Sequence, residues 1–593
     1  MIRVPSFCCA HARAGLLLVL ALAMPLVGRA AAGASHGEQR EEVTRTFDRT
    51  VAWTSGTRVC VNHSYGSVTV KTHAATEVRF HADIKVSADN RAEAEEFANK
   101  IEILVEQPAG AVCVRTNYPE TRRVERRQRN FSFSVNYDIA IPDKAPLDVR
   151  NRFGAVSASG LGAGAQIVNG HGRLSLSDSR GNHRIENSFG ATEIRNNAGD
   201  LDITGSNGAV DISQVTGSLV LRTRFGNVKL DKITKVDVRN SNGGVEMTGV
   251  GSAVVVNSFG SFTARDIGGS LSVRNENGKV DVENIQGDSD LSATFAAVTF
   301  RDIKKRLTIR SNNGAVTGSL VGGAVSIRGS FGKVDLSDVA GPVTVETNNG
   351  SILARNLRAG ATLETSFGSI DASDITGDAD LGTSNGRIIL RNVTGAATLS
   401  NSFGPVDIAG IGKGARIVSG NGAVTADNVG GETYVKTSFG AVRASRIAGA
   451  LTVENSNGSV HASDVAGAVG VRTSFSGVNL SSVQGSIDVD NQNGAVEISG
   501  VTAAAGCRTI SVRSSFAPVR VYLPENASYD VTASTSFGRI RSDFQLTLSS
   551  GTQLGGGGTT SVSIDSKIGN GGCALKLTNQ NGNIEILKGA PAR

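Results

Sequence analysis

The chain has 593 residues, of which 72 are glycine and only 11 are proline, and its formal net charge is +6. At about 100–200 residues per domain, this length would correspond to about four domains unless the chain is built from repeats. Collagen is excluded because it needs glycine at every third position together with abundant proline. Disorder of the whole chain is disfavoured as well, since 39% of the residues are hydrophobic and can bury a sizeable core.

The first 32 residues have the composition of a targeting segment. Arg3 and Arg13 supply positive charge, an apolar stretch runs from Leu16 to Val27, and small residues at 30–32 fit a cleavage site. This order is typical of a secretory signal peptide, and the stretch is too short for a membrane span. We therefore expect an exported chain, periplasmic or extracellular at the cell surface, with no transmembrane segment after cleavage. Cleavage lowers the net charge to +3, which gives no case for nucleic acid as a partner.

Four cysteines remain after the targeting segment: Cys60, Cys113, Cys507 and Cys573. Export permits disulfides, and four cysteines allow three connectivities. We favour Cys60 with Cys113 and Cys507 with Cys573, because the members of each pair lie near the same end of the chain. The alternative is that they are small buried residues of strands, as the valines on both sides of Cys60 and Cys113 indicate. No CxxC spacing predicts zinc, and no cofactor is expected.

An 18-residue unit repeats through most of the chain. Phenylalanine followed by a small residue recurs every 36 residues, with one interval of 34, and an Asn-Gly pair lies midway between most successive phenylalanines. We call these positions the repeat mark. Its central members are Phe331, Asn349, Phe367, Asn385, Phe403, Asn421, Phe439 and Asn457. Between marks, apolar and polar residues alternate in short stretches broken by turn residues, and this period of two is the signature of strands.

The repeat predicts an all-β fold: a parallel β-helix, or β-solenoid, with about 18 residues and three short strands per coil. Some 20 coils over residues 151–500, stacked about 4.8 Å apart, would make a rod on the order of 95 Å long. The open ends of such a stack need protection. We therefore expect an N-terminal cap over 33–150, with strands and a helix over Ala92–Lys100, and a β cap over 501–593. The unequal gaps between apolar positions favour a right-handed coil over a left-handed hexapeptide helix.

The order of the segments is similar to that of a known family. A Tyr-Gly-Ser-Val unit at 65–68 comes first, followed by an Ala-Glu-Glu-Phe segment at 94–97 and by Tyr-Asp-Ile-Ala-Ile-Pro at 137–142. The repeats follow, and the chain closes with residues 519–524 and 581–584. This arrangement resembles the bacterial putative-adhesin β-strand-repeat family over nearly the whole exported chain. The resemblance implies an exported, right-handed parallel β-helix with an adhesin role, and it supplies no catalytic residues.

The repeat mark admits two interpretations. Phe331 has the same parity as Ile327 and Val325, which predicts a ring that points inward or into a packed corner. In that corner, Asn side chains would bond the turn backbone and glycine would accept positive φ. The other interpretation is an exposed aromatic stripe that contacts glycans or another hydrophobic surface. We favour the packed corner.

Two further series of polar residues follow the mark. Seven residues after it stand Asp178, Asp266, Asn284, Asp302, Asp338, Asn356, Asp374, Asn392, Asn428 and Asp464. Turn chemistry explains them better than Ca²⁺ binding, because the GGxGxDx pattern is missing. Four residues after the mark stand Glu193, Asp211, Glu246, Asp281, Asp335, Asp371, Asp407 and Glu497. These carboxylates are spread along the chain, which favours a solvated face over a catalytic group.

One charge run departs from the repeat. It consists of Arg122, Arg123, Arg126, Arg127 and Arg129, within the expected N-terminal cap. Such a loop could contact anionic lipopolysaccharide, phospholipid headgroups or acidic glycans, but a solvated loop between two strands is the favoured interpretation.

Two functions from different classes remain. The first is a non-catalytic exported adhesin or cell-envelope scaffold that makes repeated surface contacts with glycans or other envelope components. The second is a carbohydrate-active β-helix that binds or cleaves polysaccharide. We favour the first, because the sequence has no His-Glu-x-x-His metalloprotease motif and the coils from 277 to 475 carry no insertion. The sequence does not set the oligomeric state.

Overall fold

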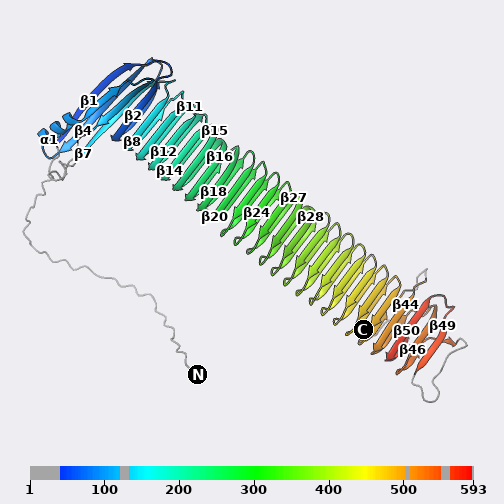
Figure 1. The fold of residues 1–593 in the computed structure, drawn as a ribbon. Coiled ribbons are helices and arrows are strands. Elements are labelled where there is room, and N and C mark those ends of the chain that lie inside the picture. Colours follow the sequence, from blue (N-terminus) through cyan, green and yellow to red (C-terminus); the bar gives the residue numbers. More distant parts are fainter. Residues whose placement is uncertain (1–40, 120–131, 503–506, 549–560, 590–593) are drawn as a thin grey trace, which may run out of the picture.

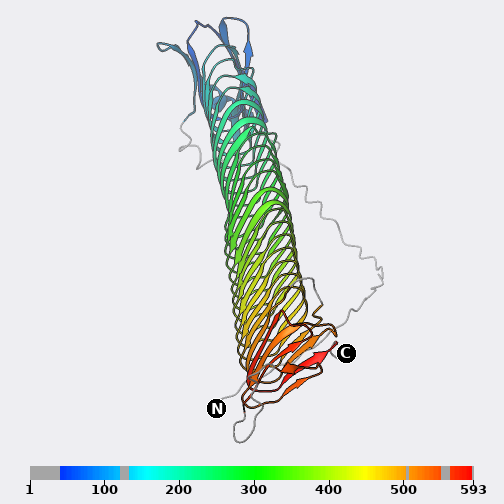
Figure 2. The same cartoon turned by 90° about the vertical axis from the view of Figure 1, so that its right-hand side faces the viewer.

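The computed structural model describes residues 41–119, 132–502, 507–548 and 561–589. These residues form one long rod of stacked coils (Figure 1). Strands make up 67% of the chain and helix 2%, and about 20 coils hold about 18 residues each, so the predicted parallel β-solenoid is confirmed. Turned by 90°, the rod shows the same stacking from its narrow side (Figure 2). The expected targeting segment and the basic run from Arg122 to Arg129 lie outside the described residues.

Each regular coil contains two strands. In one coil β31 (Ile388–Val393) is followed by β32 (Ala397–Asn401), and the next coil repeats them as β33 (Val406–Ile411) and β34 (Ala415–Ser419). β31 pairs in parallel with β33, and β32 with β34. The expectation of three strands per coil is wrong, because the Asp/Asn corner is a single residue that bends the first strand without ending it.

Residues in the left-handed backbone conformation form this bend. The φ angles of Asp338, Asn356, Asp374 and Asn392 lie between 53° and 59°, where Asp and Asn are tolerated better than other residues with a side chain. Successive coils are joined here: Asn356 donates its side-chain N–H to Asp338 at 2.5 Å, and Asn392 donates to Asp374 at 2.9 Å. A hydrogen bond from Ser337 and the one from Asn356 lower the pKa of Asp338. The series is therefore turn chemistry, as the sequence predicts.

Aliphatic side chains from both strands fill the interior of each coil. Ile388, Leu390 and Val393 of the first strand and Leu399 of the second are at most 2% exposed. Burial of such a side chain contributes roughly 1.5–3 kcal/mol. Because identical positions stack from coil to coil, the core is continuous along the rod.

At the N-terminal end the order of the coils in space differs from their order in the chain. The strands concerned are β2 (Arg58–Tyr65), β3 (Val68–His73), β6 (Ala111–Asn117), β7 (Ser132–Pro142), β8 (Leu147–Phe153) and β9 (Val156–Ser159). The β2–β3 coil pairs on one side with β8 and β9 and on the other side with β6 and β7. The later coil, β6–β7, therefore lies outside the earlier one.

Antiparallel strands and one helix complete this end. They are β1 (Glu41–Ala52), β4 (Glu77–Ala88), α1 (Arg91–Lys100) and β5 (Glu102–Glu106). β4 pairs with β7, β1 pairs with β4, and β5 pairs with β6, all antiparallel. The helix begins after Asn90, whose side chain accepts a hydrogen bond from the Ala92 N–H at 2.9 Å. The expected helix is thus confirmed to within one residue.

The C-terminal end repeats this arrangement in reverse. Its strands are β44 (Ile510–Phe516), β45 (Val519–Leu523), β46 (Tyr529–Thr535), β47 (Ile540–Ser542), β49 (Val562–Ile568), β50 (Ala574–Asn581) and β51 (Ile584–Lys588). The β50–β51 coil inserts between β44–β45 and β46–β47, and β49 pairs antiparallel with β46. The coil stack therefore extends into both ranges expected as caps.

A disulfide joins the interleaved coil to its neighbour at each end. Cys60 in β2 lies directly opposite Cys113 in β6, with the Cα atoms 4.4 Å apart. Cys507, shortly before β44, is bonded to Cys573, immediately before β50, with the Cα atoms 5.1 Å apart. Each bridge thus links two coils that are adjacent in space and distant in the chain.

Candidate interaction surface

The phenylalanines of the repeat mark form an exposed ridge along one edge of the rod. We call this set the Phe ridge; its members are Phe189, Phe225, Phe259, Phe295, Phe331, Phe367, Phe403, Phe439, Phe475, Phe516 and Phe537. Their exposed fractions lie between 47% and 65%. The expected packed corner is therefore wrong. In the second strand, side chains alternate between inward and outward as far as Thr365. The chain then bends at Ser366, so the side chain of Phe367 no longer follows this alternation and points outward.

In most coils a buried polar residue stands two positions before the mark, whereas Ala293 and Gly329 take this place before the equally exposed Phe295 and Phe331. Thr365 is 6% exposed, and its hydroxyl donates to the Gly350 carbonyl at 2.9 Å. Where the residue is Asn455, its side chain donates to the Gly440 carbonyl at 3.0 Å and to the Gly458 carbonyl at 2.6 Å. These bonds fix the carbonyls of the mark glycines, which a buried turn would otherwise leave unpaired. Our sequence reading missed this row, although a Thr, Ser or Asn recurs two positions before most marks.

The asparagines of the mark lie between the phenylalanines, in alternate coils. In several coils the Asn side chain donates to a backbone carbonyl of the preceding coil, as Asn313 does to Thr294 at 3.2 Å and Asn493 to Ser474 at 3.2 Å. The expected bond from Asn to the turn backbone is therefore present in these coils. Glycine follows because the coils approach closely here: a Cβ on Gly368 would collide with the Gly350 carbonyl.

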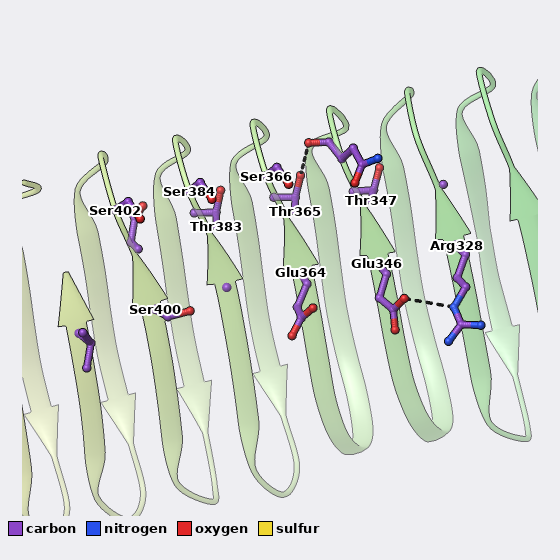
Figure 3. Close-up of a pocket in the computed structure, with 15 residues that line it drawn as sticks. Arg328, Glu346, Thr347, Glu364, Thr365, Ser366, Thr383, Ser384, Ser400 and Ser402 are labelled. Atoms are coloured by element: carbon purple, nitrogen blue, oxygen red, sulfur yellow. Dashed lines mark hydrogen bonds and ion pairs between the residues drawn. The ribbon is translucent and has the colours of Figure 1, made fainter. Parts of the chain in front are cut away.

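Residues that precede the mark line a polar groove, whose side chains are drawn in Figure 3. Its floor consists of the hydroxyls and amides that precede the mark, and its outer side is the outward row of β26 (Val325–Gly329), β27 (Val334–Thr347) and β28 (Ile352–Thr365). The hollow has a volume of about 600 Å³. Arg328 and Glu346 form an ion pair along it at 3.1 Å.

The same face is hollowed again further along the rod. A second volume of about 510 Å³ lies over the coils from Lys436 to Gln492. Its outer row also carries both signs of charge, with Lys436 3.6 Å from Glu454. The groove therefore offers hydroxyl, amide, carboxylate and guanidinium groups along much of the rod.

The N-terminal end of the ridge is continuous in aromatic residues. The rings of Tyr65, Phe153, His171 and Phe189 follow one another in adjacent coils. Their centroids are 5.5, 4.8 and 4.7 Å apart, with interplanar angles of 9°, 10° and 6°. Rings one coil apart on this edge thus stack face to face.

A buried histidine lies under this end. His63 is 3% exposed and its Nδ1 lies 3.2 Å from the Thr116 hydroxyl, which in turn lies 2.6 Å from the Tyr137 hydroxyl. Burial lowers the pKa of His63 to about 4 and raises the pKa of Tyr137 to about 12. His63 is therefore neutral near pH 7, and the network belongs to the packing of the end coils.

The carboxylates that follow the mark are dispersed, as expected. Asp335 pairs with Lys333 at 2.7 Å, and Asp407 pairs with Arg391 at 2.6 Å. Within the described ranges, no three His, Cys, Asp or Glu side chains gather as a metal site would require. In the same part of the chain, no helix is long and apolar enough to cross a membrane.

No protein-family model matches the sequence, and no curated protein does. Among solved structures, a putative cell adhesion protein from Clostridium sporogenes matches 40% of this chain over 99% of its own length, with 11% identity and a TM-score of 0.15. A putative adhesin from Bacteroides fragilis matches 49% over 97%, with 16% identity and a TM-score of 0.14. A putative lipid-binding protein from Parabacteroides distasonis matches 52% over 96%, with 10% identity and a TM-score of 0.13. The strand pairing of the chain itself makes it a β-solenoid, and these solved structures include bacterial proteins named as putative adhesins.

Proposed function

We propose that the protein is an exported, non-catalytic adhesin or cell-envelope scaffold that makes many weak contacts along its length. The observation that carries this proposal is the polar groove, which recurs on one face over the coils from Arg328 to Val418 and again from Lys436 to Gln492. A ligand that repeats along its own length, such as a glycan chain, could occupy several coils at once. Linked weak contacts of this kind raise the overall affinity without a single tight site.

The chemistry of the groove fits hydroxyl-rich ligands. Serine and threonine hydroxyls line the floor, and Arg328, Glu346 and Glu364 stand on the outer row. Charged side chains of this type form the stronger hydrogen bonds to sugar hydroxyls. We therefore assign glycans of the cell envelope as the partner class.

The test is binding of the exported chain to a glycan array and to purified envelope polysaccharides. We expect saturable binding to one class of glycan. The triple variant Arg328→Ala, Glu346→Ala, Glu364→Ala should weaken this binding at least about tenfold, because it removes three charged hydrogen-bonding groups. A control with the same charges, Arg355→Ala, Asp335→Ala, Asp371→Ala, changes the outward row of the first strand in the same region of the rod and should bind normally.

A reducing-sugar assay on the same polysaccharides addresses the catalytic alternative. We expect no turnover, and release of new reducing ends would replace the scaffold proposal by a carbohydrate-active enzyme. Absence of binding to any envelope polysaccharide would overturn the glycan assignment.

The location of the protein needs a separate measurement. We propose that it is exported to the periplasm or the cell surface, and cell fractionation combined with protease accessibility on intact cells distinguishes the two. Retention of an uncleaved chain in the cytoplasm would contradict the proposal.

A further inference from the structure

The Phe ridge alternates with asparagine in space as well as in sequence. Phe225 lies opposite Asn242 in the next coil, Asn242 lies opposite Phe259, and Phe259 lies opposite Asn277. Each Asn is therefore flanked by a phenylalanine one coil before it and another one coil after it. Both rings are about half exposed, and the Asn side chain between them is shorter than a phenylalanine side chain, so we call the space above the Asn a slot.

The alternation also holds at the C-terminal end, where the chain order is permuted, whereas at the permuted N-terminal end aromatic rings occupy successive coils. At the C-terminal end the chain runs Phe516, Phe537, Asn581, but Asn581 lies opposite Phe516 in the adjacent coil. The Phe537 N–H then donates to the Gln580 carbonyl at 2.8 Å, which places Phe537 in the coil beyond Asn581. Tandem duplication copies the order along the chain, so it does not account for an alternation that holds only in space. At this end the alternation is therefore not a copy of the order along the chain.

The slot has the dimensions of one aromatic ring. Coils stack about 4.8 Å apart, so two rings of the ridge lie about 9.6 Å apart, and a ring inserted midway would be about 4.8 Å from each. This separation falls in the range of about 4.5–7 Å at which aromatic pairs attract. The N-terminal end of the rod shows the same stack within one chain, where His171 lies 4.8 Å from Phe153 and 4.7 Å from Phe189.

We propose that the Phe ridge binds the Phe ridge of a second copy of this chain, with each ring of one copy inserted over an Asn of the other. The ring spacing and the slot spacing of the ridge are identical, so a second copy matches this surface along its whole length. A partner of another kind would need the same period over eleven rings. The resulting interface is isologous, the commonest type in homodimers.

The area is sufficient for a stable dimer. Eleven rings that each bury roughly half of about 200 Å² would remove about 1,100 Å² from water on each copy. A standard protein interface buries about 800 Å² on each partner. The association therefore clears the size expected of a specific complex.

The alternation also sets the direction of the two rods. A twofold axis along the rod would place every ring at the level of its own counterpart, so the rings would collide. A twofold axis perpendicular to the rod can place the rings of one copy at the Asn levels of the other. The dimer is therefore antiparallel.

Two opposed variants of the exported full chain test this assignment by sedimentation over a range of concentrations. The first, Phe331→Ser, Phe367→Ser, Phe403→Ser, Phe439→Ser, removes four central rings and should weaken the dimer at least about 100-fold. The second, Asn349→Phe, Asn385→Phe, Asn421→Phe, Asn457→Phe, fills four slots with the rod's own rings. Slot insertion predicts that this variant also loses the dimer, whereas unspecific hydrophobic association predicts that it associates more strongly.

Circular dichroism shows whether both variants keep the strand content of the parent, which we expect because the substituted side chains are exposed. If the Asn→Phe variant does not fold, single Asn385→Phe and Phe403→Ser variants repeat the comparison. A benzoylphenylalanine in place of Phe225 reports the direction, since an antiparallel dimer crosslinks it to the C-terminal half of the partner copy. A monomeric parent chain, a tighter dimer of the Asn→Phe variant, or a crosslink to the region of Phe225 itself would overturn the proposal. Glycan binding by the groove is measured separately, and it does not depend on this result.

Discussion

Phe516 lies directly opposite Asn581 in the paired strands β44 and β50, although Phe537 stands between them in the chain. The last coil of the chain is therefore the second coil from the end of the rod. The same holds at the other end, where the β2–β3 coil lies beneath the later β6–β7 coil. A chain terminus that formed the outermost coil would fray easily. Interleaving places each terminal coil between two neighbouring coils. A terminal coil must therefore break its strand pairing with both neighbours before it detaches.

The disulfides should stabilise the ends of the rod and leave its middle unchanged. In the chain-entropy model, a bridge that closes a loop of this length contributes about 4 kcal/mol. We expect the double variant Cys60→Ser, Cys113→Ser to open β2 and β6 locally. Hydrogen exchange measures this opening, with the coils near Ile388 as the internal reference.

The reciprocal variant Cys507→Ser, Cys573→Ser provides the control. It should increase exchange in β44 and β50 only. Increased exchange along the whole rod in either variant would contradict the local role, because contacts in a solenoid reach only neighbouring coils.

Acid should weaken the N-terminal end through His63. Its pKa is about 4 in the folded chain and 6.5 when unfolded, so between these values the unfolded state binds a proton that the folded state does not. The contribution of His63 to the free energy of unfolding is therefore fully present above pH 6.5 and is lost as the pH falls towards 4. The largest loss is about 3 kcal/mol. His63→Gln should flatten this part of the pH dependence, measured by hydrogen exchange of β2 and β6 between pH 4 and pH 8.

His81 serves as the matched histidine. It is exposed, and a hydrogen bond to Asp48 raises its pKa, so its contribution is present at low pH and is lost as the pH rises. His81→Gln should therefore leave the acid weakening in place. An equal loss of stability on acidification in the parent and in His63→Gln would refute the assignment to His63.

A methyl group at a mark glycine should disrupt the stack. In Gly368→Ala the new Cβ would meet the Gly350 carbonyl, and the coils must separate or shift to admit it. We expect a loss of about 1–3 kcal/mol, seen as local opening of β28 and β29 (Ile370–Ile375) in denaturant-dependent hydrogen exchange. Gly470→Ala is the control, because nothing lies within 4 Å of a Cβ there, and equal effects of the two substitutions would contradict the close-packing argument.

The corner at Asp338 should tolerate substitutions according to their cost at positive φ. Its φ of 57° disfavours β-branched residues, and Asp338→Val should destabilise the coil by about 1–2 kcal/mol. Asp338→Asn and Asp338→Gly should be milder, since both residues accept this conformation. Thermal unfolding of the three variants gives the order, and a Val variant as stable as the Asn variant would show that the backbone conformation carries no cost.

The sequence specified the regular part of the fold because the same local pattern recurs in every unit. Alternating aliphatic residues such as Ile388 and Leu390 define a strand face, and a left-handed Asp or Asn defines a corner, without reference to distant residues. The period of 18 then allows identical residues to stack, and burial of stacked aliphatic side chains selects the parallel solenoid. The cysteines of each favoured pair lie near the same end of the chain, and this placement favoured the pairing that the structure carries.

Only the tertiary structure decided the direction of the phenylalanines and the order of the end coils. Counting parity from Val325 to Phe331 assumes a strand that continues to the ring, but β26 ends at Gly329 and the chain bends at Ser330 before the ring is reached. Interleaving of β2–β3 and β50–β51 depends on pairing between strands that lie far apart in the chain. The local alternation of apolar and polar residues does not specify which strand pairs with which. The exposed Phe ridge therefore depends on sequence and tertiary structure together. The sequence determines its period, whereas the bend and the coil order place its rings in solvent.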